Sequence, residues 1–401
     1  MGIKASSLRG LLHRAHALFR ALLTDTGSPV YLPNELVSDI LSRIPERSVR
    51  RFRCVSKEWH ALVTAPAFVA AHKSRAEPFL VMYSNPSEGL RLIDMDGNVV
   101  RLISDMCGCW SPVSTSPDGI LCVTGYLDSY PGNAVFAGLI DLGTMEAVVT
   151  RLEDNKAWGF GRAIPSDAYK IVRFRDHIRG CNCEVYTIGG GDGWRRRKSH
   201  PLHYKYDSFE NYAATVNGVL YLLARKKPHD MDYVLCFDLE SEEWKNTIKG
   251  PSNVDIWGHD ISLGELKDTL YMAEKKNWET DHGYTNIWLL TDFDTSIWIK
   301  AYTIPLEPSM LPYAPMFCRM IPLRVLHDSS KLLFYYGSRY VLFVLRGAQL
   351  QIYDPHNETS CTDVTEKLLG DHGTVVGFCS SHLERFGSAK IQRPISSFRH
   401  I

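Results

Sequence analysis

Two Cys-x-Cys pairs are the residues of this sequence best suited to hold a metal. They are Cys107 with Cys109 and Cys181 with Cys183, and His177 precedes the second pair. A structural zinc site usually has two to four residues between its cysteines and needs a second matching pair. In a strand, Cys-x-Cys places both thiols on one face. We therefore expect reduced structural thiols, no metal site and no cofactor.

A glycine-rich run and a basic run follow each other between residues 189 and 198. The first lacks the Gly-Lys-Ser/Thr ending of a phosphate-binding loop, and Trp194 stands where a dinucleotide loop needs glycine, so a turn is expected. The basic run Trp194 to Lys198 could be a nuclear signal or a nucleic-acid patch; a solvated turn is the favoured alternative. The sequence also lacks His-Glu-x-x-His and Gly-x-Ser-x-Gly, which argues against an enzyme.

The charges of the chain balance, with 45 Lys and Arg against 45 Asp and Glu over 401 residues. A neutral chain has no bulk electrostatic reason to bind nucleic acid or an anionic membrane. The Tyr340 to Leu345 run has the length of a strand, far short of the roughly 18 to 20 residues of a membrane span. Ten scattered cysteines without a secretory signal favour reduced thiols. We expect a soluble cytoplasmic or nuclear protein.

Residues 1–30 are basic, with no acidic residue before Asp25, and their leucines repeat at helical spacing. This pattern is typical of an organelle transit peptide. The alternative is a leader helix in front of the first domain, and both interpretations stay open.

Residues 31–75 have the pattern of a small three-helix block. Leu36, Ile40 and Ile44, with Val37 and Leu41 beside them, predict one wide apolar face on the first helix. Pro33 is expected just inside the start of that helix, and Ser56 is expected to cap a later one. Such a small block has more apolar positions than it can bury, so the surplus should contact another surface.

This block resembles the F-box, a motif of roughly forty residues. The matching positions, in order, are Leu32-Pro33, Leu36, Ile40-Leu41, Ile44-Pro45, Ser48-Val49, Phe52 to Lys57, Trp59, Leu62 and Pro66 to Phe68. Val49 stands where the family usually has Leu. The resemblance implies that the block binds a Skp-type adaptor, which links it to the cullin and RING subunits of a ubiquitin ligase. The residues that would face the adaptor are Leu32, Pro33, Leu36, Ile40, Leu41, Ile44, Pro45 and Val49.

The resemblance also implies that Phe52, Val55, Trp59 and Leu62 hold the block together, some of them also touching the partner. The segment from 32 to 75 has eight basic residues against four acidic ones, which suggests an acidic partner. The alternative is a self-contained helical bundle or a cap on the rest of the protein.

From residue 78 to 385 the sequence alternates short apolar runs with turn residues, which predicts many short strands. Asn217 to Tyr221 is echoed by Lys267 to Tyr271 fifty residues later, and Trp244 is followed by Trp298 after 54 residues. A period near fifty is typical of β-propeller blades and predicts six or seven of them. The alternative is an irregular β-sandwich. Residues 386–401 would be a C-terminal tail.

The large region resembles the F-box-associated domain of plant families. The runs that carry this likeness are Gly159 to Gly161, Tyr169 to Val172, Cys183 to Tyr186, Trp194-Arg195, Val216 to Tyr221, Phe237 to Trp244, Leu263 to Leu266, Ile287 to Leu290 and Trp298 to Lys300. Most are expected to be scaffold: Gly218 in a tight turn, Asp238 bonded to its own following backbone, and Trp244 and Trp298 packed between blades.

A target protein would bind through loops on one face of the propeller. The aromatic and histidine candidates for this contact are Trp257, His259, Trp278, Tyr284 and Tyr313. The two resemblances together imply a non-catalytic, substrate-recognition subunit of an SCF-type ubiquitin ligase, with an unidentified target protein. The alternatives are an adaptor-binding scaffold that is not used for degradation, and a propeller enzyme.

Overall fold

The computed structural model describes most of the two predicted regions and divides the chain into two compact units, Met1–Ala76 and Glu77–Ile401. Each unit is described by itself. The described residues are 33–44, 49, 52–75, 79–83, 90–103, 109–115, 119–126, 135–142, 147–152, 158–177, 180–188, 190, 193–198, 213–224, 233–252, 254, 261–276, 283–305, 319–326, 330–337, 349–356, 361–368 and 374–379. Leu32, Pro45 and the 1–30 leader lie outside them.

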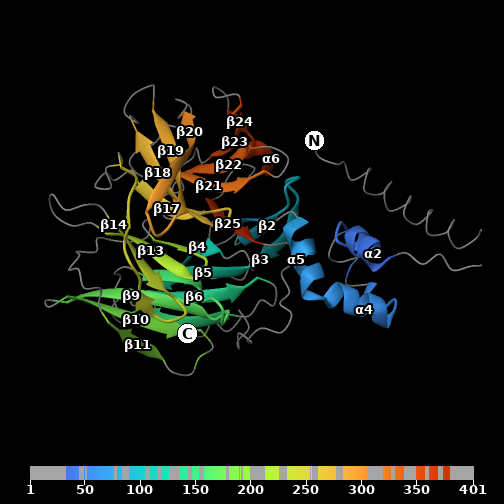
Figure 1. Cartoon of the computed structure of the whole chain (residues 1–401), viewed down its shortest axis with the longest axis horizontal. Helices are drawn as coiled ribbons and strands as arrows, with labels where there is room; N and C mark the ends of the chain where they lie inside the picture. The colour runs from blue at the N-terminus through green and yellow to red at the C-terminus, as the bar shows by residue number, and fades with distance from the viewer. Residues whose placement is uncertain are drawn as a thin grey trace, which may run out of the picture. The chain divides into compact units, whose positions relative to one another are not determined.

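The first unit contains three described helices: α2 (Asn34–Leu41), α4 (Lys57–Thr64) and α5 (Pro66–Arg75) (Figure 1). Pro33 is the cap residue before α2, one position earlier than predicted, and its carbonyl accepts the first helical hydrogen bond, from Val37 N at 3.1 Å. Ser56 caps α4 as predicted, because its Oγ accepts a hydrogen bond from Trp59 N at 3.1 Å.

The helices of this unit enclose a small apolar core. Its buried members are Leu41, Val49, Val63 and Phe68, from α2, the segment that follows it, α4 and α5. The rings of Phe52 and Trp59 pack edge to face at 5.5 Å against this core. A 2.7 Å contact between Nε2 of buried His72 and the carbonyl of Ile44 ties α5 to the end of the α2 segment.

The second unit consists of antiparallel sheets, each of four strands or, in one case, five. Five blades each use consecutive strands. The first blade contains β4 (Cys109–Thr115), β5 (Ile120–Tyr126), β6 (Val135–Asp141) and β7 (Ala147–Leu152), and the second contains β8 (Trp158–Arg162), β9 (Tyr169–His177), β10 (Gly180–Thr187) and β11 (Trp194–Arg197). The third blade contains β12 (Ala213–Val216), β13 (Val219–Ala224), β14 (Tyr233–Asp238), β15 (Glu243–Trp244) and β16 (Ile248–Lys249). The fourth blade contains β17 (Ile261–Leu266), β18 (Thr269–Lys276), β19 (Tyr284–Asp292) and β20 (Ile297–Pro305), and the fifth contains β21 (Arg319–Val325), β22 (Leu332–Gly337), β23 (Gln349–Tyr353) and β24 (Cys361–Asp363).

One further sheet is assembled from both ends of this unit. It joins β25 (Thr374–Cys379) to β1 (Phe79–Tyr83), β2 (Leu90–Ile93) and β3 (Val99–Ile103), after the short helix α6 (Thr365–Leu368) (Figure 1). Its neighbours are the fifth blade, through the apolar cluster that contains Leu80 and Tyr335, and the first blade, through a hydrogen bond from Arg101 Nη1 to Leu142 O at 2.6 Å. This composite sheet therefore closes the ring.

The fold class is as predicted, a small helical unit followed by an all-β propeller, but the predicted number of blades is wrong if only blades of consecutive strands are counted. Six or seven blades were expected from the repeat length. The described strands give five blades of consecutive strands and the composite sheet. A repeat length cannot reveal that strands from residues 79–103 and 374–379 share one sheet, because that pairing joins segments at opposite ends of the unit.

Neighbouring blades repeat the same local structures, which explains the echoes in the sequence. The β12–β13 turn has positive φ at Asn217 (49°) and Gly218 (78°), and the β17–β18 turn has positive φ at Lys267 (55°) and Asp268 (56°). Both turns therefore use the left-handed region at their two central residues, a backbone conformation that matches the twist of a two-residue hairpin.

An aspartate after the third strand organises the next turn in several blades. Asp238 Oδ1 accepts hydrogen bonds from the backbone N–H groups of Glu240 and Ser241 at 3.0 and 2.9 Å, as predicted. Asp292 does the same for Asp294 and Thr295, and Asp354 accepts from His356 N at 3.0 Å. Tyr353-Asp354-Pro355 occupies the corresponding place in the fifth blade.

Each of two tryptophans connects its blade to the blade before it. Trp244 Nε1 donates to Lys198 O at 2.9 Å, and Trp298 Nε1 donates to Lys249 O at 2.8 Å. Both indoles pack against the apolar cluster of the second, third and fourth blades. The prediction that these tryptophans pack between blades with a locally satisfied indole N–H is confirmed.

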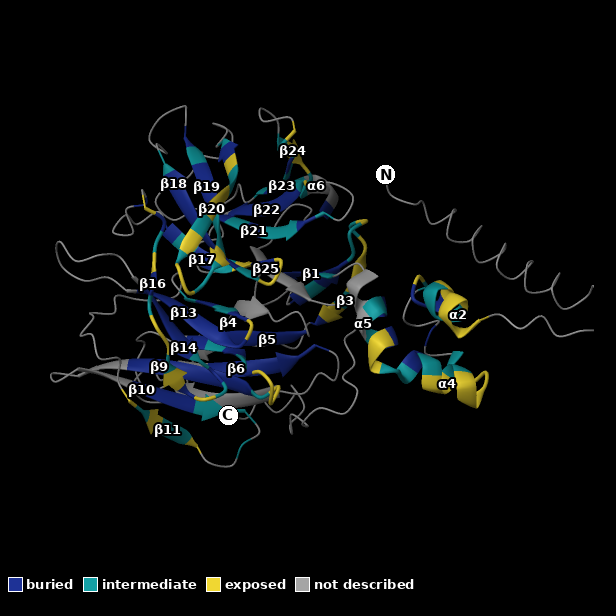
Figure 2. Cartoon of the chain, in the orientation of Figure 1, coloured by how far each residue is buried: buried dark blue, intermediate teal, exposed yellow. Residues whose placement is uncertain are grey.

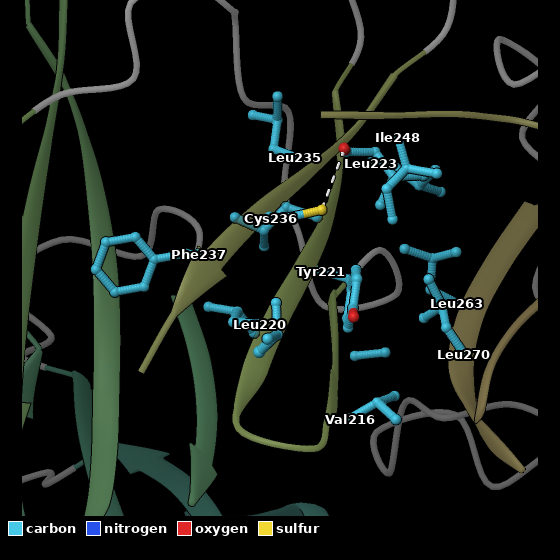
Figure 3. Close-up of a cluster of buried hydrophobic side chains, with 14 of the residues drawn as sticks. Val216, Leu220, Tyr221, Leu223, Leu235, Cys236, Phe237, Ile248, Leu263 and Leu270 are labelled. Carbon is cyan, nitrogen blue, oxygen red and sulfur yellow. Dashed lines mark hydrogen bonds between the residues drawn. The ribbon is translucent and has the colours of Figure 1, made fainter. Parts of the chain in front are cut away.

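The largest apolar cluster lies where the second, third and fourth blades meet. Figure 3 shows its centre, in which Leu223 and Ile248 of the third blade lie on the side of the sheet that faces Leu263 and Leu270 of the fourth blade. Leu235 lies on the opposite face of the same sheet. These side chains are almost completely buried. Because each blade buries its faces against its neighbours, the strands are apolar on both faces and read as continuous apolar runs.

Gly161 marks a very close approach between the second and third blades. A Cβ at this position would lie 2.3 Å from Thr215 Cγ2 and 2.7 Å from Leu239 Cδ1. Thr215 cannot easily rotate away, because its Oγ1 donates to Phe160 O at 2.7 Å. We therefore predict that Gly161→Ala lowers the free energy of unfolding by about 1–3 kcal/mol, measured by urea denaturation. Adding Thr215→Ala should recover part of the loss; an unchanged denaturation midpoint in Gly161→Ala would contradict the packing.

The connections between strands separate into two ends of the propeller. At one end, the turns between first and second strands and those between third and fourth strands contact the turns of the neighbouring blade. Ser166 Oγ donates to Glu240 Oε2 at 2.5 Å, and Asn217 Nδ2 donates to Asp268 O at 2.9 Å. We call this side the hairpin end. Because the strands are antiparallel, the strand ends that flank segments 199–212, 255–260, 277–282 and 306–318 lie at the opposite, open end.

Candidate functional site

Helix α2 carries apolar side chains on two different sides. Val37 and Leu41 face the core of the helical unit, and Leu41 is 3% exposed. Leu36 and Ile40, one turn apart, lie outside that core and are 53% and 50% exposed. Figure 2 shows that much of α2 is exposed. The single wide apolar face predicted from the sequence is therefore divided between a buried and an exposed side. An exposed Leu–Ile pair on a short helix is a surface suited to contact with another protein.

The structure separates the predicted adaptor-facing residues into two groups. Leu36 and Ile40 are exposed together on α2, and Pro33 is exposed just before it. Leu41 and Val49 are buried in the core of the unit, and Ile44 is half-buried. Leu32 and Pro45 lie outside the described residues. The residues that remain available to a partner without unfolding the helices are Pro33, Leu36 and Ile40, which we call the α2 face.

Val55 was expected to help hold the helical block together, but it lies outside the apolar core of this unit. Phe52, Trp59 and Leu62 do pack against the core, but Val55 is 60% exposed in the turn before α4. Helical periodicity could not place it, because Val55 lies in a turn between two helical segments. It adds a further exposed apolar side chain to this unit.

The charged residues next to the α2 face are largely solvated. Arg43 Nε lies 3.1 Å from Asp39 Oδ2, and both side chains are substantially exposed. An exposed pair one helical turn apart contributes only a few tenths of a kcal/mol to helix stability. Both charges of this pair stay in water. The free energy of binding a partner therefore comes mainly from covering the apolar side chains.

Of the candidates for target binding, Tyr284 lies in the described part of the chain, at the open end of the propeller. Tyr284 is half-buried at the first residue of β19, where it pairs in register with Lys276 and Pro305. Trp257, His259, Trp278 and Tyr313 lie outside the described residues. The structure therefore places one of the five candidates and leaves the others as predictions.

A polar network that sequence reasoning missed lies beside Tyr284 in the fourth blade. Lys276 Nζ lies 2.7 Å from Glu274 Oε1, Asn286 Nδ2 donates to Glu274 Oε2 at 3.3 Å, and Thr303 Oγ1 donates to Asn286 Oδ1 at 3.0 Å. Glu274 and Asn286 are only 4% and 6% exposed. The network could have been predicted from the sequence, because polar residues occupy alternate positions of strands that are otherwise apolar. The network holds these side chains in fixed orientations at the open end.

A second network, at the hairpin end, surrounds the buried carboxylate of Glu242 between the second and third blades. Lys170 Nζ and Arg195 Nη2 lie 2.9 and 2.6 Å from its Oε1, and Arg197 contacts its Oε2. Burial alone would raise the pKa of this carboxyl, but hydrogen bonds from Arg195, Lys170 and Arg197 lower it to about 2. Glu242 is therefore an anion throughout the physiological pH range.

This network corrects the prediction of a solvated turn for the basic run. Trp194–Arg197 form the strand β11, which pairs with β10. Arg195 and Arg197 point to Glu242, and the guanidinium of Arg173 stacks over the Trp194 ring at 3.9 Å. Strands β10 and β11, on either side of the glycine-rich run, are neighbours in one sheet, and most of that run lies outside the described residues.

The thiols and acidic groups of the described residues show no arrangement for metal binding. No cluster of three or more His, Cys, Asp or Glu side chains within them could hold an ion. Cys122, Cys183 and Cys236 are buried, and burial raises the pKa of the Cys236 thiol to about 12, so it stays protonated. Cys54 differs from the expected pattern, because it is exposed.

Among the helices that the structure describes, none combines the length and the apolar character needed to cross a membrane.

Two family models match this chain, one in each unit. The F-box domain matches residues 31–69, and the F-box associated beta propeller domain matches residues 165–321. The first match contains the α2 face, and the second covers most of the second blade and all of the third and fourth. The helical block and the propeller were thus both identified correctly from their motifs.

The similar curated proteins are F-box proteins of Arabidopsis thaliana. One putative F-box protein is 26% identical over 309 residues, which cover 70% of this chain and 75% of the relative. A second is 24% identical over 327 residues, covering 76% of this chain and 75% of the relative. A further F-box protein is 26% identical over 326 residues, or 69% and 76% of the two chains.

Solved structures with a similar fold are remote. The beta-propeller domain of the Trilobed protease from Pyrococcus furiosus is 10% identical with a TM-score of 0.36, covering 65% of this chain and 73% of that one. TolB from Acinetobacter baumannii is 13% identical with a TM-score of 0.39, covering 71% and 68%. Neither similarity carries an argument about function.

Proposed function

We propose that this protein is the substrate-recognition subunit of an SCF-type cullin–RING ubiquitin ligase. Its helical unit binds a Skp-type adaptor through the α2 face, and the adaptor brings the cullin and RING subunits. Its propeller binds the target protein. The observation that carries the proposal is the exposed Leu36–Ile40 pair on a helix whose other side already fills the core, within a segment that matches the F-box domain.

Such a subunit makes no bond itself. It holds the target near the ubiquitin that other subunits deliver, so its contribution to the rate is proximity and orientation. The target contacts the open end of the propeller, where Tyr284 and the Lys276–Glu274–Asn286–Thr303 network lie. A complex of this kind works in the cytoplasm or the nucleus, and we include that location in the proposal.

The test is affinity capture of the tagged full chain from plant cells, with and without proteasome inhibition. The wild type is compared with the double variant Leu36→Asp/Ile40→Asp. We expect an adaptor, a cullin and a RING protein to be captured with the wild type and lost with the variant. A target should bind both proteins, accumulate on proteasome inhibition, and carry ubiquitin only in cells with the wild type.

Other outcomes favour the alternative function. Partners that are captured equally with and without inhibition, and whose ubiquitination does not change, would indicate an adaptor-binding scaffold that is not used for degradation. Capture of the adaptor by the variant at the wild-type level would show that the α2 face is not the docking surface.

A further inference from the structure

The outer strands of the second and third blades place a lysine at equivalent positions. Lys198 directly follows β11, and Lys249 ends β16. The backbone carbonyl of each accepts the indole N–H of the tryptophan in the next blade, Trp244 for Lys198 and Trp298 for Lys249. The backbone of both lysines is therefore fixed, and both residues are exposed. Lys300, also exposed, lies on the outer strand of the fourth blade two residues after Trp298.

The three lysines, Lys198, Lys249 and Lys300, have no carboxylate partner within 4 Å among the residues that the structure describes. Arg196 is 70% exposed at its side chain and forms only a long ion pair, with its Nε 3.9 Å from Glu184 Oε1. Neighbouring Arg195 and Arg197 differ, because Glu242 neutralises part of their charge. We call Arg196, Lys198, Lys249 and Lys300 the basic rim.

The basic rim places four positive charges on or next to the outer strands of three successive blades, in a chain whose total charges balance. Like charges on successive strands repel one another, and a partner of opposite sign removes that repulsion and is attracted over about a Debye length, roughly 8–10 Å. The rim strands are also edge strands: β11 and β20 each end their sheet. An edge strand can add an extended segment of another chain through backbone hydrogen bonds.

We propose that the basic rim binds an acidic segment of a protein partner. A polypeptide is favoured over a nucleic acid by the aromatic residues nearby. Binding of single-stranded nucleic acid uses exposed aromatic rings on which bases stack, whereas the indoles of Trp244 and Trp298 pack against the core and hold the neighbouring blade. Each lysine carries a compact point charge, so separate lysines can each pair with one of the carboxylates spaced along an acidic segment. This surface is distinct from the α2 face, and its binding needs no adaptor.

The test measures fluorescence anisotropy of a labelled, extended peptide rich in Asp and Glu, titrated with the full-length protein at low and at physiological salt. We expect binding that weakens as salt increases. The double variant Lys198→Glu/Lys249→Glu should weaken binding at least about tenfold at low salt, since each reversed charge turns an attraction into a repulsion. Both side chains are exposed, so the variant should keep the wild-type circular dichroism spectrum and thermal transition.

The matched control is Lys57→Glu/Lys267→Glu, which changes the net charge equally at two exposed lysines, one on α4 and one in a turn at the hairpin end. Its affinity for the peptide should stay within about twofold of the wild type. Three results would overturn the proposal: no binding of the peptide by the wild type, an equal loss in both double variants, or tighter binding of a single-stranded oligonucleotide of the same charge.

Discussion

Leu36→Asp/Ile40→Asp should weaken binding of a purified Skp-type adaptor by at least about 100-fold, measured by isothermal titration calorimetry with the full chain. Each side chain is about half exposed in the isolated protein. Covering the exposed half of both contributes about 2–3 kcal/mol. The variant loses that contribution and also forces two carboxylates out of water at the contact, which adds a desolvation cost. Every 1.4 kcal/mol lost weakens the affinity tenfold.

The control for this variant is Ile297→Asp/Ile299→Asp in the propeller. These isoleucines on β20 are 49% and 55% exposed, so the two double variants remove similar apolar surface and add the same charge. We expect the control to bind the adaptor with wild-type affinity. Thermal denaturation should show that both variants remain folded, because all four side chains lie outside the apolar cores. Equal binding by the wild type and the α2 variant would place the adaptor on another surface.

The sequence was sufficient for features whose cause is local. The left-handed residues of the Asn217-Gly218 turn and the backbone bonds of Asp238 depend on residues within a few positions. The same holds for the cap at Ser56. Each of these features is fixed by backbone conformation and short-range hydrogen bonding, which residue type controls directly.

Features that depend on distant parts of the chain could not be obtained in this way. Helical spacing predicted five apolar positions on the first helix, and four of them lie within α2. Val63 and Phe68 on later helices decide that Leu41 is buried and Leu36 is not. The basic run was interpreted as solvated because its counter-charge, Glu242, lies 45 residues beyond Arg197. The composite sheet was hidden for the same reason, since its strands come from opposite ends of the propeller unit.

The Glu242 network should be the largest single electrostatic contribution to the stability of the propeller unit. Glu242→Gln keeps the shape of the side chain and the positive φ of 57° at this residue, and removes only the charge. Lys170, with a side chain 8% exposed, then keeps a buried charge without its carboxylate, and Arg195 and Arg197 lose the same partner. Removing one partner of a buried ion pair typically lowers the free energy of unfolding by about 3–5 kcal/mol. Urea denaturation at neutral pH measures this loss.

The difference in free energy of unfolding between the wild type and Glu242→Gln should depend on pH if it comes from the charge of Glu242, and should not if it comes from side-chain packing. The pKa of Glu242 falls from an ordinary value of 4.5 to about 2 on folding, so its stabilising effect is complete above pH 4.5 and disappears as the pH falls towards 2. The wild type and Glu242→Gln should therefore converge in acid. The matched control is Glu243→Gln, the next residue, which is exposed and should change the stability by less than about 0.5 kcal/mol. A Glu242→Gln deficit that is the same at pH 3 and pH 7 would mean that side-chain packing, and not the ion pairs, joins the second blade to the third.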